Sequence, residues 1–444
     1  MSSLLAHAHV LTLDDAETEL DDGWILFDGG FVTAVGAGEE PQADERIDLG
    51  GAVVTPALIN THHHLYQTLT RARAPQGTLF EWLVELYPTW ANVDAEAEYA
   101  AARTGLAELA LSGCGTVFDH HYVFPHGRDG LVEAEVQAAR ELGVRIVASR
   151  GSMDLGASQG GLPPDSVVES IEGILEDTKR LAGLHEREPG ARVQIAVAPC
   201  SPFSVTAELM RESAALAREL GLQLHTHLAE TVEEGEFCRE RFGCSPVEYL
   251  ERIDWLADDV WCAHCVHLGD GDVTRFADTG TGVAHCPSSN LRLGAGIAPL
   301  RKLKDAGVRV GLGVDGSASN ERGDLFLEAK QALLLARGLG GPTALTAREA
   351  LRLATRGGAS LLGRDDLGSL EPGKCADFAV WSRDRLELSG AVDPVAGLVF
   401  SAPHRPEQVY VGGEPVAAGG ALIHADEFEI AREHRAQARR LATA

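Results

Sequence analysis

The feature that most constrains the fold of this chain is a unit that recurs through its middle: one short apolar run followed by one amphipathic stretch. The apolar runs have the length and composition of buried strands, and stretches such as residues 95–111 and 206–220 have helical periodicity. Eight apolar runs fit this pattern: Val53–Asn60, Gly115–Asp119, Val144–Ser149, Val193–Pro199, Leu222–His227, Val260–Cys265, Gly282–His285 and Val310–Val314.

Glycine closes several of the predicted helices just before the next strand, as in "LSGCG", "ELGV", "ELGL" and "DAGV". Glycine is the preferred residue at this position because it adopts the left-handed conformation that ends a helix. Eight strand–helix units in series predict a parallel (β/α)8 barrel, the TIM barrel, over residues 55–366.

Both ends of the chain have a different pattern. Residues 1–54 and 367–424 are rich in glycine and in short strand-like runs, and they lack helical periodicity. We expect them to form one small composite β-sandwich domain. Residues 425–444 combine charged residues with alanine, which is typical of an exposed helix.

Composition excludes several classes of function. Hydrophobic residues make up 45% of the 444 residues, enough for a sizeable core, and the formal net charge of −28 argues against binding nucleic-acid phosphates. No apolar run is long and uncharged enough to span a bilayer, and residues 1–20 lack the basic start of a secretory signal. We therefore expect a cytoplasmic enzyme without a nucleic-acid or membrane partner.

The eight cysteines are scattered along the chain, which favours buried free thiols over a disulfide framework. Cys262 and Cys265 form a C-x-x-C pair, but they lie in an apolar run and no second pair accompanies them. We expect this pair to be chemically inert.

Histidines and acidic residues follow the predicted strands at the ends where a barrel of this kind carries its reactive groups. A large share of the 17 histidines lies at these positions, which indicates a metal site. The residues concerned are His62, His63, His64, Asp119, His120, His121, His225, His227, Glu230, His264, His267, His285 and Asp315.

The alternation of side chains along an extended strand separates the three consecutive histidines. His62 and His64 share one face and can bind one ion together, whereas His63 faces the helical layer. His227 is nearer the open end of its strand than His225 and is the better ligand. Asp315 completes the set from the last strand.

Three imidazoles and one carboxylate suit one divalent ion, expected to be Zn²⁺ with Fe²⁺ or Mn²⁺ as alternatives, and leave a position for water. Such an ion lowers the pKa of bound water from about 15.7 towards about 7. We expect Glu230 to carry the proton and His264 to orient the attacking oxygen or stabilise developing charge. The sequence contains five lysines and none ends the run Val193–Pro199, so no carbamylated lysine is expected to bridge two ions there.

In order along the chain, His62-x-His64, His227, His264 and Asp315 resemble the metal site of the amidohydrolase superfamily. The motifs "HTHLAE", "HCPSSN" and "GVDGSASN" are similar to its cytosine/guanine-deaminase and chlorohydrolase-like branch. Within that branch "THHHLYQTLTRA", "SRGSMDLGASQGGLPP" and "APCSPFSVT" look most like 8-oxoguanine deaminases, with triazine hydrolases close behind.

The resemblance implies one metal ion, Glu230 as acid and base, and a small heterocyclic substrate that loses an amino group. Alternatives are an s-triazine amino- or chlorohydrolase, a guanine- or isocytosine-type deaminase, and an inactive scaffold. The loop "APCSPFSVT" lacks the arginine of guanine deaminases, which counts against guanine itself. Asn60 stands where many superfamily members carry aspartate, a change expected to tune the site rather than to remove a ligand.

Substrate contacts are expected from the loops around the site. Gln67 offers an amide donor and acceptor for a heterocycle, and the aromatic residues of residues 79–93 could stack on a planar ring or simply pack the helix onto the barrel. The candidates for substrate binding are Gln67, Trp82, Tyr87, Trp90 and His285. We also expect a homo-oligomer, a dimer or larger.

Overall fold

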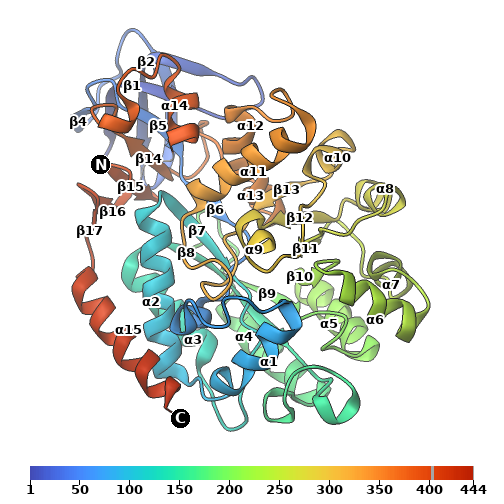
Figure 1. Ribbon diagram of the computed structural model, residues 1–444. Coiled ribbons are helices and arrows are strands. Elements are labelled where there is room, and N and C mark those ends of the chain that lie inside the picture. Colours follow the sequence, from blue (N-terminus) through green and yellow to red (C-terminus); the bar gives the residue numbers. More distant parts are fainter. Residues whose placement is uncertain (402–404, 444) are drawn as a thin grey trace.

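The computed structural model describes residues 1–401 and 405–443, and its centre is a closed barrel of eight parallel strands (Figure 1). The first and last barrel strands close the ring through the pairing of Asn60 with Leu312. The predicted TIM barrel is confirmed. Its strands in chain order are β6 (Leu58–Asn60), β7 (Cys114–Asp119), β8 (Arg145–Ser152), β9 (Val193–Pro199), β10 (Gln223–Leu228), β11 (Val260–His264), β12 (Gly282–His285) and β13 (Val310–Leu312).

Helices surround the barrel, and their ends follow the local sequence signals (Figure 1). Asp94 and Thr206 accept hydrogen bonds from the first turns of α2 and α5, and Gly143 and Gly221 end α3 and α5 in the left-handed conformation. The helices are α1 (Leu79–Trp90), α2 (Ala95–Leu111), α3 (Leu131–Leu142), α4 (Ile171–Leu181), α5 (Ala207–Leu220), α6 (Val232–Phe242), α7 (Pro246–Arg252), α8 (Asp270–Thr279), α9 (Pro287–Arg292), α10 (Leu300–Asp305), α11 (Leu325–Gly340), α12 (Ala347–Arg352) and α13 (Gly358–Leu361).

Both termini contribute to a separate β-domain at one end of the molecule, as the sequence predicts (Figure 1). Hydrogen bonds connect its nine strands into one sheet, ordered β17-β16-β15-β14-β5-β1-β2-β3 with β4 paired to β1. The strands are β1 (Ser3–Leu11), β2 (Glu19–Asp28), β3 (Phe31–Ala37), β4 (Glu45–Asp48), β5 (Val53–Pro56), β14 (Phe378–Trp381), β15 (Gln408–Val411), β16 (Glu414–Ala418) and β17 (Ala421–Leu422).

The apolar run 53–60, expected to be one strand, is divided between the two sheets. β5 pairs with β1 and β14 of the β-domain, whereas β6 pairs with β7 and β13 of the barrel. Both segments are buried, so hydrophobicity alone does not mark the change of sheet at Ala57. This junction ties the β-domain directly to the strand that precedes His62.

Two further helices, α14 (Pro394–Ser401) and α15 (Glu427–Ala442), lie outside the barrel. In Figure 1, α15 runs alongside α2, and ion pairs join Arg440 to Asp94 and Glu433 to Arg103. Among the described helices, none combines the length and the apolar character needed to cross a bilayer.

Candidate metal centre and active site

Four buried side chains from three barrel strands meet at the end of the barrel where β6, β10 and β13 finish. The Nε2 atoms of His64 and His227 are 3.1 Å apart. Oδ1 of Asp315 lies 3.4 Å from Nε2 of His62 and 3.3 Å from Nε2 of His64. These separations bring the predicted ligand set to one common centre.

Hydrogen bonds on the far side of each ring define which nitrogen carries the proton. Nδ1 of His64 donates to the carbonyl of His120 at 2.7 Å, and Nδ1 of His227 donates to the carbonyl of Cys200 at 2.7 Å. A carbonyl can only accept, so the Nε2 atom of each neutral ring keeps its lone pair. Both lone pairs face the common centre.

His62 is oriented in the same way through a second histidine. Nδ1 of His225 donates to the carbonyl of Trp261 at 2.9 Å, so Nε2 of His225 is an acceptor. Nδ1 of His62, 2.9 Å from that atom, therefore donates to it, and Nε2 of His62 faces the centre without a hydrogen-bond partner among the described residues. Metal-binding histidines commonly have their second nitrogen fixed in this way.

The charge state of the four side chains fits a divalent cation. Burial lowers the pKa values of His62, His64 and His227, which favours the neutral, ligating imidazole. Burial alone would raise the pKa of Asp315, but contact with His62 and the charge of His264, whose own pKa is raised, outweigh it and hold the pKa of Asp315 well below its usual range. The lone pairs of the three imidazoles and the carboxylate of Asp315 point at one another and repel. A divalent cation at their centre would attract all four groups.

Two serines hold Asp315 in place. Oδ2 accepts hydrogen bonds from Ser289 at 2.5 Å and from Ser319 at 3.2 Å, and the amide of Gly316 donates to Oδ1 at 2.7 Å. Asp315 also has φ +64, a conformation that is uncommon outside glycine and that recurs at functional sites. Ser289 lies in the "HCPSSN" motif, but sequence alone did not predict this contact.

His264 ends β11 with φ +71 and is oriented by a residue that sequence reasoning missed. Nδ1 of His264 donates to Oδ1 of Asn290 at 2.8 Å. Nε2 then faces the centre, 3.7 Å from Oε2 of Glu230 and 3.9 Å from Oδ2 of Asp315. An imidazole placed between two carboxyl groups can hold or orient a water molecule there.

Glu230 lies in the turn after β10 and is 4% exposed. Burial raises its pKa to about 7, so it can accept and release a proton near neutral pH. The carboxylate of Glu234 accepts hydrogen bonds from the amides of Ala229 and Glu230 at 2.8 and 2.9 Å, which fixes this turn. Thr231 and Glu234 have the T-x-x-E spacing of a capping box, a signal that could have identified Glu234.

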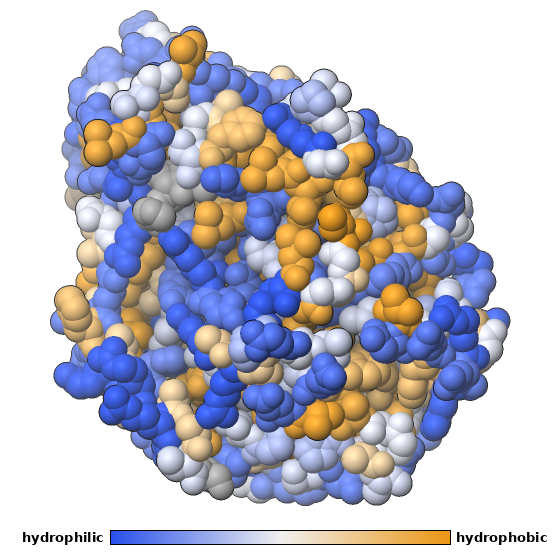
Figure 2. Space-filling view, viewed as in Figure 1, coloured by the Kyte–Doolittle hydropathy of each residue, from blue (hydrophilic) through white to orange (hydrophobic). Residues whose placement is uncertain are grey.

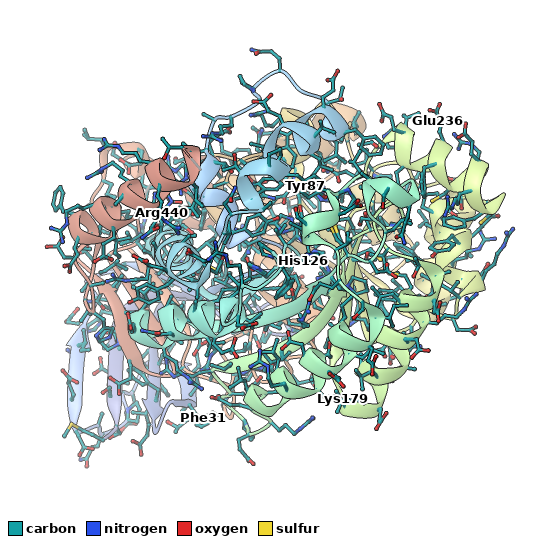
Figure 3. The ribbon with its side chains drawn as sticks, turned by 90° about the horizontal axis from the view of Figure 1, so that it is seen from below. Phe31, Tyr87, His126, Lys179, Glu236 and Arg440 are labelled. Atoms are coloured by element: carbon teal, nitrogen blue, oxygen red, sulfur yellow. The ribbon has the colours of Figure 1, made fainter. Side chains whose placement is uncertain are left out.

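A small pocket opens directly beside these residues, with about 380 Å³ of space that includes solvent at its mouth. Gln67, Trp82 and Tyr87, three of the candidates for substrate binding, line it. Figure 3 shows Tyr87 near the centre of the molecule, with Arg440 on α15 and Glu236 on α6 at opposite flanks. The remaining lining residues are His64, Leu79, Leu83, Tyr122, Cys200, Phe203, His227, Glu230, His264, Leu293, Asp315 and Ser319.

The structure does not bring Trp90 or His285 to this pocket, which corrects the expectation for both. Trp90 packs against the rings of Tyr66, Trp82 and Tyr87 and donates from Nε1 to Thr70 at 3.1 Å. His285 lines a different cavity, beside α10 and α11. Ala284 packs inside the barrel, so the next residue along the strand points to the helices.

His120 is an additional candidate that sequence reasoning left undecided. Its Nε2 donates to the carbonyl of Ala198 at 2.8 Å, and its ring stacks on His227 with centroids 4.6 Å apart. One nitrogen each of His62, His64, His120 and His227 lies within 4.8 Å of the others. His120 therefore lies close enough to support or extend the ligand set.

The fold and the donor set together define the class of hydrolytic TIM barrels with a histidine-rich site for a divalent ion. The chain belongs to the Amidohydrolase family, whose profile matches residues 53–416. It is similar to 8-oxoguanine deaminase of Pseudomonas aeruginosa, with 48% identity over 94% of each chain.

Two further similarities extend this comparison. Hydroxydechloroatrazine ethylaminohydrolase of Pseudomonas sp. is 38% identical over 90% of this chain and 84% of its own length. The solved structure of atrazine chlorohydrolase from Arthrobacter aurescens, complexed with zinc, superposes with a TM-score of 0.94 and 36% identity over 98% of this chain and 100% of that chain. The protein is thus an enzyme of a family that contains deaminases and other hydrolases acting on C–N bonds.

Proposed function

We propose that this enzyme hydrolytically deaminates a free oxidised purine base, 8-oxoguanine, to urate and ammonia. The observation that carries the proposal is the group of converging Nε2 lone pairs, Asp315 and Glu230 beside a small pocket. The 48% identity to an 8-oxoguanine deaminase over almost the whole chain supports the choice of substrate.

One divalent ion, Zn²⁺ in the first instance and Fe²⁺ as an alternative, would be held by His62, His64, His227 and Asp315. When bound, it would polarise a water molecule and lower its pKa towards neutrality. The zinc in the structure of the related chlorohydrolase supports this choice of metal. Each protein ligand is oriented by a hydrogen bond from its far side, so the site needs little rearrangement to bind the ion.

Glu230 accepts a proton from the attacking water and passes it to the exocyclic nitrogen of the substrate. The water oxygen forms a bond to the ring carbon that carried the amino group, and the bond from that carbon to nitrogen breaks. Ammonia leaves, and the ring retains a carbonyl in its place. His264 stabilises the charge that develops between Glu230 and Asp315 during this change.

Gln67 is our candidate for recognition of the ring. Its Oε1 atom is buried without a hydrogen-bond partner among the described residues, and the side chain lines the pocket. A buried amide oxygen of this kind favours a ligand with a ring N–H donor. Trp82 and Tyr87 line the pocket and would cover the planar base.

A second candidate function is hydrolysis of an s-triazine with loss of an alkylamine or chloride. The similarities to an ethylaminohydrolase and to a chlorohydrolase favour it, because the same donor set would serve either leaving group. Guanine deamination ranks lower, since the loop from Pro199 to Thr206 contains no arginine, and isocytosine deamination is a further alternative. An inactive scaffold ranks lowest because no residue of the expected ligand set is missing.

A substrate panel tests the assignment. The zinc-loaded enzyme is assayed for ammonia release with 8-oxoguanine, guanine, isocytosine, a hydroxylated triazine and adenosine, and chloride release is measured with a chlorotriazine. We expect the highest kcat/KM with 8-oxoguanine, with urate identified by its absorbance. A higher value with guanine or with either triazine would overturn the substrate while leaving the roles of Glu230 and the histidines open to test.

We also propose that the enzyme acts in the cytoplasm as a homo-oligomer, a dimer or larger. All eight cysteines are free and buried, which suits a reducing compartment. In Figure 2, apolar residues gather where α11 and α12 lie, and exposed Leu334 and Leu339 of α11 and Phe400 of α14 contribute apolar surface. Sedimentation velocity measures the oligomeric state, and a monomer at micromolar concentration would contradict the proposal.

A further inference from the structure

A second cluster of ionisable side chains lies outside the barrel, between β7, α2 and α3. Glu98 comes from α2 and Glu135 from α3, while Asp119 ends β7 and His121 follows it. All four side chains are 0% exposed. Phe118 packs inside the barrel, so alternation along the strand directs Asp119 and His121 outward, away from the active-site pocket.

Most of the polar atoms in this cluster face no hydrogen-bond donor among the described residues, apart from a proton that Asp119 and Glu135 are close enough to share. These atoms are both carboxyl oxygens of Glu98, both of Glu135, Oδ2 of Asp119 and Nδ1 of His121. Buried polar atoms are normally satisfied, because burial without a partner is costly. So many buried acceptors in one place indicate protons or a bound cation among them.

The orientation of His121 shows what kind of ligand is needed. Its Nε2 lies 2.9 Å from the carbonyl of Val123 and donates to it, so the lone pair of the neutral ring is on Nδ1. Nδ1 is 2.9 Å from Oε1 of Glu135 and 3.6 Å from Oε2 of Glu98. Acceptors face one another at these distances, so a shared proton or a cation must lie between them.

The same arrangement occurs in the catalytic ligand set. There, donor atoms are separated by 3.1 to 3.4 Å, and each ring is anchored through its other nitrogen. Ligand atoms at about 2.0–2.2 Å from a common ion have separations of this size. One ligand atom each of Glu98, His121 and Glu135 lies within 4.8 Å of the others.

Within residues 1–401 and 405–443, no lysine or arginine forms an ion pair with the three carboxyl groups of the cluster. Arg150 acts on His121 electrostatically, but its guanidinium is paired with Glu169 and Asp177. A proton on His121 would neutralise only one of three carboxylates. Burial raises the pKa values of Glu98, Glu135 and Asp119, consistent with the cost of holding negative charge there.

We propose that Glu98, His121 and Glu135 bind a second divalent transition-metal ion, Zn²⁺ or Mn²⁺, in the helical layer outside the active site. Carboxylate oxygens with one imidazole suit these two ions. The ion would raise the metal content from the one ion of the catalytic centre to two per chain. It would crosslink α2 and α3 to the end of β7.

The place of this ion gives it an influence on the catalytic ligands. Oδ1 of Asp119 accepts a hydrogen bond from the amide of Leu65 at 2.6 Å, and Leu65 follows His64 directly. His120, between Asp119 and His121, supplies the carbonyl that orients His64. An ion fixing His121 therefore stabilises the segment that holds a catalytic ligand, without touching the substrate.

Metal content and anomalous diffraction test the proposal without reference to turnover. Metal-free enzyme is reconstituted with Zn²⁺ alone or Mn²⁺ alone, desalted, and analysed by inductively coupled plasma mass spectrometry. We expect two equivalents in the wild type and in Glu141→Gln, an exposed position at the end of α3, and one in Glu135→Gln. Crystals of the Mn²⁺ enzyme should show two anomalous peaks, one of them between Glu98, His121 and Glu135.

One equivalent of metal in the wild type, with a single anomalous peak at the catalytic centre, would overturn the proposal. Glu98, Asp119, His121 and Glu135 would then be a cluster held together by shared protons. The wild-type crystals decide the question even where Glu135→Gln fails to fold. The result is independent of the substrate, because neither measurement uses the reaction.

Discussion

Nδ1 of His62 lies 2.9 Å from Nε2 of His225, so one buried histidine sets the direction of the other. The chain of hydrogen bonds continues from Nδ1 of His225 to the carbonyl of Trp261 on the neighbouring strand β11. His62 thus presents a lone pair to the metal centre only while His225 keeps its tautomer. We therefore expect His225, which is not itself a ligand, to influence how strongly His62 binds the metal ion.

Replacing His225 should therefore weaken metal binding. In His225→Asn the acceptor for Nδ1 of His62 is lost or displaced, and we expect about 10- to 100-fold lower zinc affinity. Competition with a chromophoric chelator measures the change. His424→Gln, at an exposed position of the β-domain, is the matched control and should bind zinc like the wild type. Equal affinity in His225→Asn would show that His62 does not need this partner.

Replacing Glu230 should remove turnover and leave the metal in place. Glu230→Gln keeps the shape of the side chain but cannot accept the water proton, and we expect kcat to fall by about 10²- to 10⁴-fold. Ammonia release gives kcat, and elemental analysis gives zinc content. Glu233→Gln, on the exposed face of α6, should retain both. Undiminished turnover in Glu230→Gln would assign the proton transfer to another group.

Much of the fold and of the candidate metal centre could be predicted because both follow from the regular alternation of apolar strands and amphipathic helices along the chain. His62, His64, His227 and Asp315 each follow a buried apolar run, and the carboxyl ends of parallel barrel strands meet at one face. Alternation along the strand then separates the outward from the inward side chains. The same rule, applied one residue past Ala284, would have directed His285 away from the pocket.

Contacts that depend on loop conformation could not be predicted in this way. Asn290 reaches His264 from α9, and Glu234 reaches back to the amide of Glu230, yet neither contact has a periodic signal. Trp90 belongs to the aromatic stretch expected near the substrate, but the rotation of α1 buries it behind Trp82 and Tyr87. A helix offers one face to the pocket, and the sequence does not say which.

Adding a methyl group at Gly316 should impair substrate binding through Gln67. A Cβ at this position would overlap Oε1 of Gln67, so Gly316→Ala displaces the amide that we assign to the ring. We expect kcat/KM for 8-oxoguanine to fall about 10- to 100-fold with zinc content unchanged. Gly338→Ala in α11, where a Cβ meets open space, is the control.

The combination with Gln67→Ala distinguishes this explanation from a general distortion of the Asp315 loop. If Gly316→Ala acts through Gln67, the double variant should be no worse than Gln67→Ala alone. Additive losses would mean that the methyl group disturbs Asp315 independently of Gln67.

Acidification should loosen the C-terminal helix α15 through His434. Burial lowers the pKa of His434 to about 4, and its Nε2 lies 3.1 Å from Oγ1 of Thr68 in the turn that carries Gln67. The free histidine titrates near 6.5, so the packed helix favours the neutral ring. This contribution to stability is complete above about pH 6.5 and is lost as the pH falls towards 4.

Hydrogen exchange of the α15 amides at pH 7 and pH 4.5, corrected for intrinsic rates, measures this effect. The free energy of opening should fall by on the order of 1–2 kcal/mol more in the wild type than in His434→Gln, allowing for partial exposure of the ring. The other buried histidines titrate in both proteins and cancel in the comparison. Arg71 and Arg435 add to the repulsion of a protonated ring, and the ion pair between Arg440 and Asp94 persists until Asp94 is protonated. An equal pH dependence in both proteins would show that His434 is not the group that couples α15 to acidity.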